Sequence, residues 1–286
     1  MAEGVPFKAA LKAGSFVLRK TTIARCAEFG SLRDFIMEEK RAKMDKFKPE
    51  FTCQRTVLQE HCDFADRMRP AALLHAVQQV GTDHCNSIGM TPAFYKEHHM
   101  AFLLAKQVLE IYRTPTLGET LTYMTRPETP RRAIYKRLHR IEDEAGLPVA
   151  EVDSRWVLVD VETRRILRHM PKEMNLCDWP EPIDEELSLT IAKAAEMEAP
   201  VEQVARYSLC DQNGHLNNAS WLDVLCDALP LEQIQAAPLC RAAINYHWEV
   251  PMGHEFTLSR GRVERGWYLN GQRDGRCCIE AELDFF

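Results

Sequence analysis

The fold of this chain is decided by a stretch of sequence that occurs twice. Residues 210–225 read CDQNGHLNNASWLDVL, and residues 62–77 read CDFADRMRPAALLHAV. Both copies begin with Cys-Asp, continue to a basic or imidazole side chain, and then enter an apolar run with helical spacing. They differ mainly in their polar residues, since only the second copy carries Asn213 and His215. Such a repeat predicts two similar halves with unequal roles.

Each copy stands between a short strand-like stretch and a series of further strands. TCQRTVLQE precedes the first copy, and EQVARYSL precedes the second. Pro70 suits the first turn of a helix in the first copy; in the second, Asn217 or Asn218 can cap a helix that Pro230 would stop. Segments rich in β-branched and aromatic residues follow. We expect strands at residues 100–113, 119–126, 132–143 and 148–161, and again at 242–250, 255–264 and 277–286, with NGQRDG at 270–275 as a hairpin turn.

Strand, helix and then several antiparallel strands, twice over, predict an α+β protein. In each half a central helix would be wrapped by a curved antiparallel sheet, which is the hotdog topology. The chain would then be a tandem (double) hotdog. We expect an N-terminal extension at residues 1–50, a first hotdog at 51–175, a Pro- and acid-rich linker at 176–200 and a second hotdog at 201–286.

Composition narrows the class of protein. Apolar residues make up 45% of the 286 residues and charged residues 27%, as in globular proteins with an ample core. The net charge of -6 does not favour nucleic acid as a partner. The ten cysteines form no CxxC pair and no metal-ligand spacing, so we expect reduced thiols, no metal and no cofactor. No apolar run approaches the roughly 20 residues that a membrane span needs.

The first fifty residues differ from the rest because they are net basic. We expect a helical or loosely ordered extension there, with an organelle transit peptide as the alternative. The corresponding compartments are a bacterial-type cytoplasm or an organelle stroma.

Asp211, Asn213 and His215 alternate just ahead of the second predicted helix. The first N–H groups of a helix have no partners within it, and the helix dipole favours negative charge there. We therefore expect a place for an oxyanion, with Asn213 as a further donor and His215 positioning substrate or sharing a proton. Asp211 would orient the Asn amide or cap the helix. Each residue alone has a plain structural interpretation as a cap or turn residue.

Comparison with the first copy distinguishes the functional from the structural interpretation of these three residues. The first copy retains the acid as Asp63 but has Ala65 and Arg67 in place of Asn213 and His215. A scaffold role should persist in both copies, whereas a single site needs its polar set only once. We therefore predict a functional site in the second half and a degenerate one in the first.

A base for water would complete the site. Glu249, at the end of a strand-like run, is the candidate, and its neighbours Trp248, Val250 and Pro251 should reduce its solvation. Asp211 remains an alternative base.

These segments resemble the acyl-acyl-carrier-protein (acyl-ACP) thioesterases of plants and bacteria. DQNGHLNNASWLDVL resembles their Asp-x-Asn-x-His-x-Asn-Asn motif, and INYHWEVPMGHEF resembles their downstream strand, in which Glu is followed by Cys in the plant enzymes. SRWVLVDVETRRILRHMP and GETLTYMTRPETPRRAIYKRLHRI are similar to segments of their first half. The likeness runs from about Phe51 to the C-terminus.

The resemblance implies a tandem hotdog that hydrolyses the thioester of fatty acyl-ACP and so ends chain elongation. Carried over by position, the catalytic set is Asp211, Asn213, His215 and Glu249. Val250 stands at the plant Cys position, which excludes a cysteine nucleophile there. Water activated at Glu249 is the remaining interpretation; whether Glu249 or His215 takes the proton stays open. Cys210 and its counterpart Cys62 are interpreted as packing residues.

The implied substrate asks for two further surfaces. We expect an acyl pocket in the first half, lined by Leu73, Leu74, Val77, Phe102, Leu104 and Trp156. Carrier proteins are acidic, so we expect a basic docking patch at Arg131, Arg132, Lys136 and Arg137, or alternatively at Arg164, Arg165 and Arg168. The chain would act as a monomer of two pseudo-dimeric halves or as a homodimer.

Three alternatives remain open at this stage. One is a hotdog thioesterase that acts on coenzyme A esters. Another is a hotdog dehydratase or hydratase, which the Asn-x-His spacing with a separate Glu fits poorly. The third is a non-catalytic acyl-binding protein.

Overall fold

The computed structural model describes residues 50–174, 179–181 and 187–286, all of which belong to one compact unit. The predicted extension lies outside the described residues, apart from Glu50. None of the described helices is both long and apolar enough to cross a membrane.

The first half follows the predicted order of strand, helix and antiparallel strands. Pro70 is the first residue of its long helix, where a missing N–H costs nothing. The elements are β1 (Phe51–Thr56), a 3₁₀ turn (Gln59–His61), α4 (Pro70–Ser87), α5 (Pro92–Glu97), β2 (Met100–Ile111), β3 (Thr120–Pro127), β4 (Ile134–Glu142), β5 (Pro148–Asp160), β6 (Arg165–Ile166) and a 3₁₀ turn (Lys172–Met174).

The second half repeats this order with shorter elements. Its central helix ends before Pro230, which introduces a further short helix. The elements are β7 (Val201–Val204), a 3₁₀ turn (Tyr207–Leu209), α6 (Ser220–Asp227), α7 (Leu231–Ala236), β8 (Leu239–Tyr246), β9 (Glu255–Arg262), β10 (Gly266–Arg273) and β11 (Arg276–Phe285).

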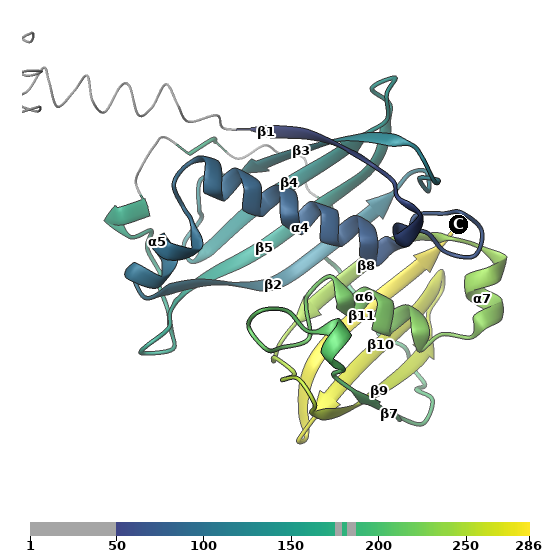
Figure 1. Cartoon of the computed structure of the whole chain (residues 1–286). Coiled ribbons are helices and arrows are strands. Elements are labelled where there is room, and N and C mark those ends of the chain that lie inside the picture. The colour runs from purple at the N-terminus through teal and green to yellow at the C-terminus, as the bar shows by residue number, and fades with distance from the viewer. Residues whose placement is uncertain (1–49, 175–178, 182–186) are drawn as a thin grey trace, which may run out of the picture. The chain divides into compact units, whose positions relative to one another are not determined.

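One antiparallel sheet runs through both halves (Figure 1). Its strand order is β1-β3-β4-β5-β2-β8-β11-β10-β9-β7, with β6 paired to β5. The halves join where β2 pairs with β8, from Lys106 opposite Asn245 to Glu110 opposite Arg241. We call this pairing the seam.

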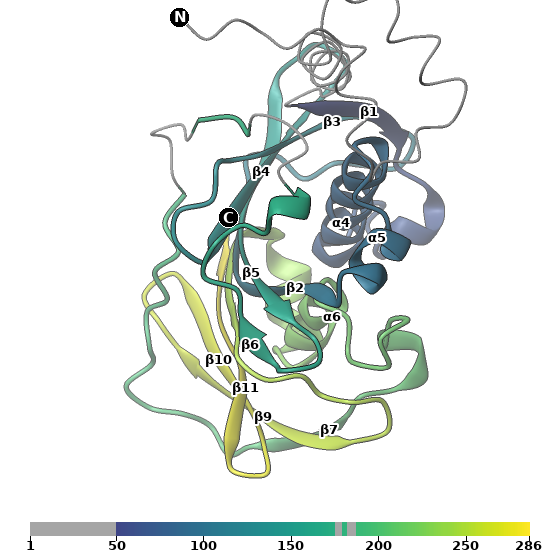
Figure 2. The same cartoon turned by 90° about the vertical axis from the view of Figure 1, so that its left-hand side faces the viewer.

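Both central helices lie against the same face of the sheet (Figure 2). A single apolar core unites them, because Leu73 and Leu74 of α4 and Leu222 and Leu225 of α6 belong to one buried cluster. A smaller cluster lies near α5 and is built around Met90, Met100, Tyr135, Leu158 and Met174.

Residues 187–200 of the predicted linker lie against the opposite face of the second half's sheet. The Ala192 N–H donates to Glu282 Oε2 at 2.8 Å, and the Glu198 N–H donates to the Arg260 carbonyl at 2.7 Å. We call this segment the strap. It is thus attached to β9 and β11 rather than merely connecting two halves.

Two differences between the observed and predicted strands bear on the site. The predicted strand 242–250 ends at Tyr246, so Glu249 lies in the following loop. The predicted hairpin turn at 270–275 was wrong in extent: residues up to Arg273 belong to β10, and only Asp274 and Gly275 form the turn.

Candidate active site

The site residues of the second half are held by a tight turn. The Asp211 carboxylate accepts from the Asn213 N–H at 2.8 Å, and the Asp211 N–H donates to the His215 carbonyl at 3.0 Å. Gly214 adopts a φ of +74°, which favours glycine. The turn therefore fixes where His215 leaves the backbone.

The first half contains the same turn without the same side chains. The Asp63 carboxylate accepts from the Ala65 N–H at 2.8 Å, and Asp66 takes the positive-φ position. Arg67, at the position of His215, donates from Nε to Asp63 at 2.9 Å, and both side chains are largely buried. The shared Asp thus builds the turn in both halves, while Arg67 is tied back to it.

Glu249 is brought to His215 by a loop that pairs with the turn. The Leu216 N–H donates to the Val250 carbonyl at 2.9 Å, and the Met252 N–H donates to the Gly214 carbonyl at 2.8 Å. Between these two bonds, His215 Nδ1 lies 3.5 Å from Glu249 Oε2. The structure therefore brings together the two side chains that the sequence singled out for proton transfer.

The predicted solvation of Glu249 was wrong. Its side chain is 57% exposed and that of His215 is 32% exposed, although Val250 beside it is fully buried. Glu249 lies in the loop after β8, where Val250 is buried in the core and the Glu249 carboxylate is left in contact with solvent.

The predicted oxyanion site at the start of α6 was also wrong. Asn217 accepts from the Ala219 and Ser220 N–H groups, at 2.8 and 3.3 Å. These first N–H groups are therefore occupied by the cap, and Asp211 in turn accepts from the Asn217 amide at 3.4 Å. Asn213 is exposed beside the turn, so its amide is left as the donor nearest in sequence to His215.

The cysteines that flank the two turns are poor nucleophiles. Burial raises the pKa of both Cys62 and Cys210, and the neighbouring Asp carboxylates raise it further. A catalytic thiol needs a lowered pKa, so the packing interpretation of these residues fits the structure.

The six predicted acyl-pocket residues do not lie in one cluster. Leu73, Leu74 and Val77 belong to the main core, whereas Phe102 and Trp156 pack against the smaller cluster near α5. Leu104 is buried but belongs to neither. The acyl pocket stays a prediction.

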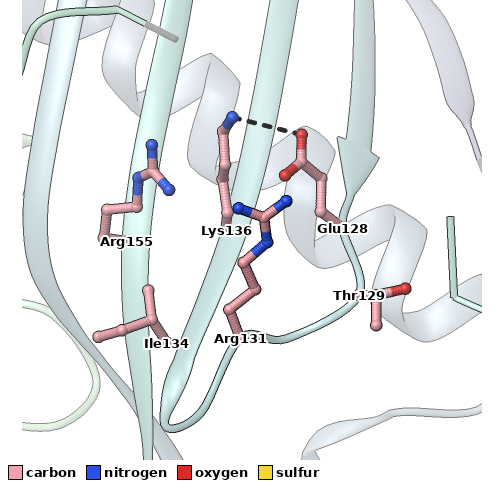
Figure 3. Close-up of a pocket in the computed structure, with 6 residues that line it drawn as sticks. All are labelled: Glu128, Thr129, Arg131, Ile134, Lys136 and Arg155. Atoms are coloured by element: carbon pink, nitrogen blue, oxygen red, sulfur yellow. Dashed lines mark ion pairs between the residues drawn. The ribbon is translucent and has the colours of Figure 1, made fainter. Parts of the chain in front are cut away.

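Half of the predicted docking patch faces inward. Lys136 is 5% exposed and its Nζ lies 3.4 Å from Glu128 (Figure 3). Arg137 donates to Thr125 and contacts His84 Nδ1, both at 3.1 Å. The inclusion of Lys136 in a surface patch was wrong because its ammonium group turns inward to Glu128 and Asp153, and Arg137 is partly buried because its guanidinium turns to Thr125 and His84. Arg131 and Arg132 are exposed, as are Arg164, Arg165 and Arg168.

One group of side chains has the composition of a metal site. His247, Cys277 and Glu280 offer ligand atoms within 4.8 Å of one another. Glu280 already accepts from Lys193 and from Tyr268, each at 2.7 Å, and its other oxygen lies 3.0 Å from His247. The Lys193 ammonium group therefore already balances the charge of Glu280, and the three side chains belong to a hydrogen-bonded network.

Sequence reasoning missed the neighbours of the Glu249 loop. Arg273 and Arg276, at the ends of the β10–β11 hairpin, both contact the Trp248 ring, and Arg273 also donates to the Glu249 carbonyl. The sequence predicts a turn near Arg273 and singles out Glu249 beside Trp248, but it does not predict that these two segments contact each other.

Two family models match the chain in sequence order. The acyl-ACP thioesterase N-terminal domain matches residues 45–176, and the C-terminal domain matches residues 192–274. The oleoyl-acyl carrier protein thioesterase 1 of Arabidopsis thaliana is 24% identical over 204 residues, covering 62% of this chain and 54% of that protein. The palmitoyl-acyl carrier protein thioesterase of Cuphea hookeriana is 25% identical over 174 residues, covering 57% and 41%. The chain thus spans about half the length of the curated relatives it matches.

Solved structures confirm the predicted tandem hotdog. An acyl-ACP thioesterase from Bacteroides thetaiotaomicron matches with a TM-score of 0.72 at 22% identity, covering 86% of this chain and 99% of that one. The 12:0-ACP thioesterase from Umbellularia californica matches with a TM-score of 0.69 at 14% identity, covering 84% and 98%. Because the two family models together match well over half of its residues, the chain belongs to the acyl-ACP thioesterase family.

Proposed function

We propose that this protein hydrolyses the thioester between a fatty acyl chain and acyl carrier protein, releasing the fatty acid and the carrier thiol. Family membership supports the reaction class. The observation that carries the proposal is the 3.5 Å approach of His215 Nδ1 to Glu249 Oε2. The first half, with Arg67 tied to Asp63, has no such pair at the matching position.

The orientation of the imidazole supports one division of roles between His215 and Glu249. Nδ1 of His215 faces the Glu249 carboxylate, and Nε2 makes no hydrogen bond with any described residue. A proton on Nδ1 would be held by Glu249, which leaves the Nε2 lone pair to accept a proton from water. Glu249 would then orient His215 and stabilise the imidazolium.

The reaction follows in two steps. Water attacks the thioester carbonyl carbon as Nε2 takes its proton, and a tetrahedral oxyanion forms. Asn213, exposed beside the turn, would donate to that oxyanion. The carbon–sulfur bond then breaks, and the departing thiolate recovers the proton from Nε2. No covalent enzyme intermediate is needed, in keeping with buried Val250 after Glu249.

The substrate would engage two further regions. Exposed Arg131 and Arg132 would attract the acidic carrier, although they are only half of the originally predicted patch. The acyl chain would enter between α4 and the sheet, where the apolar residues of the first half gather.

We also propose that the protein acts as a monomer in a reducing, cytoplasm-like compartment. The seam already pairs the two halves as a homodimer would, and the described cysteines are free.

The first test measures hydrolysis of acyl-ACP by the protein and by the variants H215A and E249Q. Each substitution is expected to lower kcat by about 10²–10⁴-fold, because it removes a group from proton transfer. T114V is the matched control. The Met68 N–H donates to the Pro115 carbonyl as the Leu216 N–H does to the Val250 carbonyl, so Thr114 occupies the position of Glu249 in the first half, and T114V should leave kcat unchanged.

Two outcomes would contradict the proposal. Absence of hydrolysis by the folded parent protein, with acyl-ACP bound, would favour a non-catalytic binding protein. Faster turnover of the same acyl group on coenzyme A would favour the other thioesterase class.

A further inference from the structure

The tip of the β10–β11 hairpin reaches the loop that carries Glu249. Arg273 ends β10, Arg276 begins β11, and the two residues between them have positive φ values of 51° and 72°. This is the geometry of a tight two-residue hairpin turn, which fixes the register of its flanking residues. The positions of both arginines are therefore set by the sheet.

Arg273 makes three contacts from this fixed point. Its terminal nitrogen donates to the Glu249 carbonyl at 3.2 Å, and its guanidinium carbon lies 4.6 Å from the centre of the Trp248 ring. Its Nε donates to the Asp274 carboxylate at 3.2 Å. The Arg273 side chain is only 13% exposed, whereas its partner Asp274 is 74% exposed. Arg276 adds a second cation 4.4 Å from the same ring.

The first half has the same hairpin-to-loop contact in a different form. Arg113 occupies the position of Trp248 and donates to Asp143 of the β4–β5 hairpin at 3.4 Å, and to Glu119 at 2.7 Å. There the cation comes from the loop and the partners are carboxylates. In the second half the cations come from the hairpin, and one of them binds the main chain of Glu249.

We propose that Arg273 is a positioning residue for the catalytic pair, an inference that rests on the proposed function. The exposed Glu249 side chain has His215 as its ion-pair partner, so its place depends on its backbone. Arg273 holds that backbone by its carbonyl and by the adjacent ring. A displacement of about 1 Å at a reacting centre can cost about 100-fold in rate, so this bond matters for turnover.

The test compares R273A with the parent protein in steady-state hydrolysis of acyl-ACP. We expect kcat to fall by about 10–100-fold with KM changed less than about twofold, because the carboxylate is misplaced while the binding surfaces are intact. R273Q, which keeps a donor for the carbonyl, should recover part of kcat. R113A is the matched control and should leave kcat unchanged.

A double-mutant cycle separates positioning from general damage. In the E249Q background, R273A should have little further effect, because the group that it positions is already disabled. An equal loss of kcat in both backgrounds, or unchanged kcat in R273A, would overturn the inference.

Hydrogen exchange provides a readout that does not need activity. Amides of residues 247–252 should exchange faster in R273A than in the parent protein, and those around Asp143 should not. If the parent protein hydrolyses nothing but exchange rises as expected, the proposed function fails while the contact is upheld. Unchanged exchange together with full activity would refute the positioning role alone.

Discussion

At the scale of single residues, Glu280 of β11 joins the strap to the second half's sheet through Lys193. It accepts from Lys193 and Tyr268 through one oxygen and faces His247 through the other. Hydrogen bonds from these partners outweigh burial and lower its pKa from 4.5 to about 2. The same contact raises the pKa of Lys193, so each partner favours the charged form of the other.

This shift predicts a pH-dependent contribution to stability. A lowered folded-state pKa stabilises the protein above the unfolded value of 4.5, and this stabilisation is lost as the pH falls through about 2. The pKa shift of Glu280 sets the upper limit of this contribution, and solvent screening at the exposed Lys193 reduces it. E280Q should therefore lower the free energy of unfolding at pH 7 by about 2 kcal/mol.

Urea unfolding at several pH values measures this difference. The gap between the parent protein and E280Q should be constant above pH 6 and should narrow progressively as the pH falls from about 5 to about 2. E264Q, which changes an exposed glutamate, is the control. A gap that widens on acidification would contradict the assignment.

At the scale of elements, the strap crosses β9 at a position that only glycine allows. A Cβ on Gly261 would overlap the Glu196 carbonyl and would lie 2.6 Å from the Ala194 Cβ. The strap is also tied by the ion pair between Glu198 and Arg260 at 2.8 Å. Close approach of two backbones therefore explains a glycine within this strand.

G261A should push the strap away from the sheet. We expect a loss of about 1–3 kcal/mol in the free energy of unfolding, as for other overpacked sites, and faster proteolysis within residues 187–200. S259A, two residues earlier on the same face of β9, is the control. Equal protease resistance in both variants would show that the strap does not depend on this approach.

Local sequence patterns predicted most helices and strands, and they predicted the turn that carries His215. The Pro70 helix start and the strands of the first half followed from propensity and alternation. The turn at Asp211 followed from its repeat at Asp63. β10 was missed because Gly271 suggested a turn, although glycine is needed there since a Cβ would lie 2.8 Å from the Ile279 side chain. The six-residue helices α5 and α7 are too short to show periodicity.

The remaining features depend on contacts between distant segments. Lys136 is buried and Arg137 partly buried because their charged groups have partners on other segments, and basic residues in a sequence are ordinarily taken as exposed. The contact of Arg273 with the Glu249 loop depends on the register of a hairpin against a loop from another strand. The spacing of residues along the sequence predicts neither the partners of the β4 basic residues nor the contact of Arg273.

At the scale of the described unit, the seam makes the two halves one folding unit. β2 and β8 are interior strands, and α4 and α6 are joined by the Arg69–Asp223 ion pair at 2.9 Å. Tyr246 at the end of β8 donates to the Asn218 carbonyl at 3.0 Å, which ties the seam to the start of α6. The two halves are thus joined by main-chain pairing, by ion pairs and by a shared apolar core.

A243P should therefore destabilise both halves together. Ala243 is buried in β8 between Val108 of β2 and Glu282 of β11, where proline removes a ladder hydrogen bond and costs about 3 kcal/mol or more. Fluorescence of variants that retain only Trp156 or only Trp267 should report one shared transition at a lower denaturant concentration.

V204P, on the edge strand β7, is the control and should be tolerated better. Loss of the Trp267 signal while the Trp156 signal stays native would show that the halves unfold independently.

The two halves that pair through β2 and β8 belong to one polypeptide, and this allows their two turns to differ in sequence. In an assembly of two identical chains, any substitution in one turn is made in the other as well, so each must keep its reactive groups. Joining both copies in one polypeptide removes that symmetry, and Arg67 could neutralise Asp63 without disturbing His215. Covalent fusion is thus what permits a molecule built from two like parts to specialise each of them.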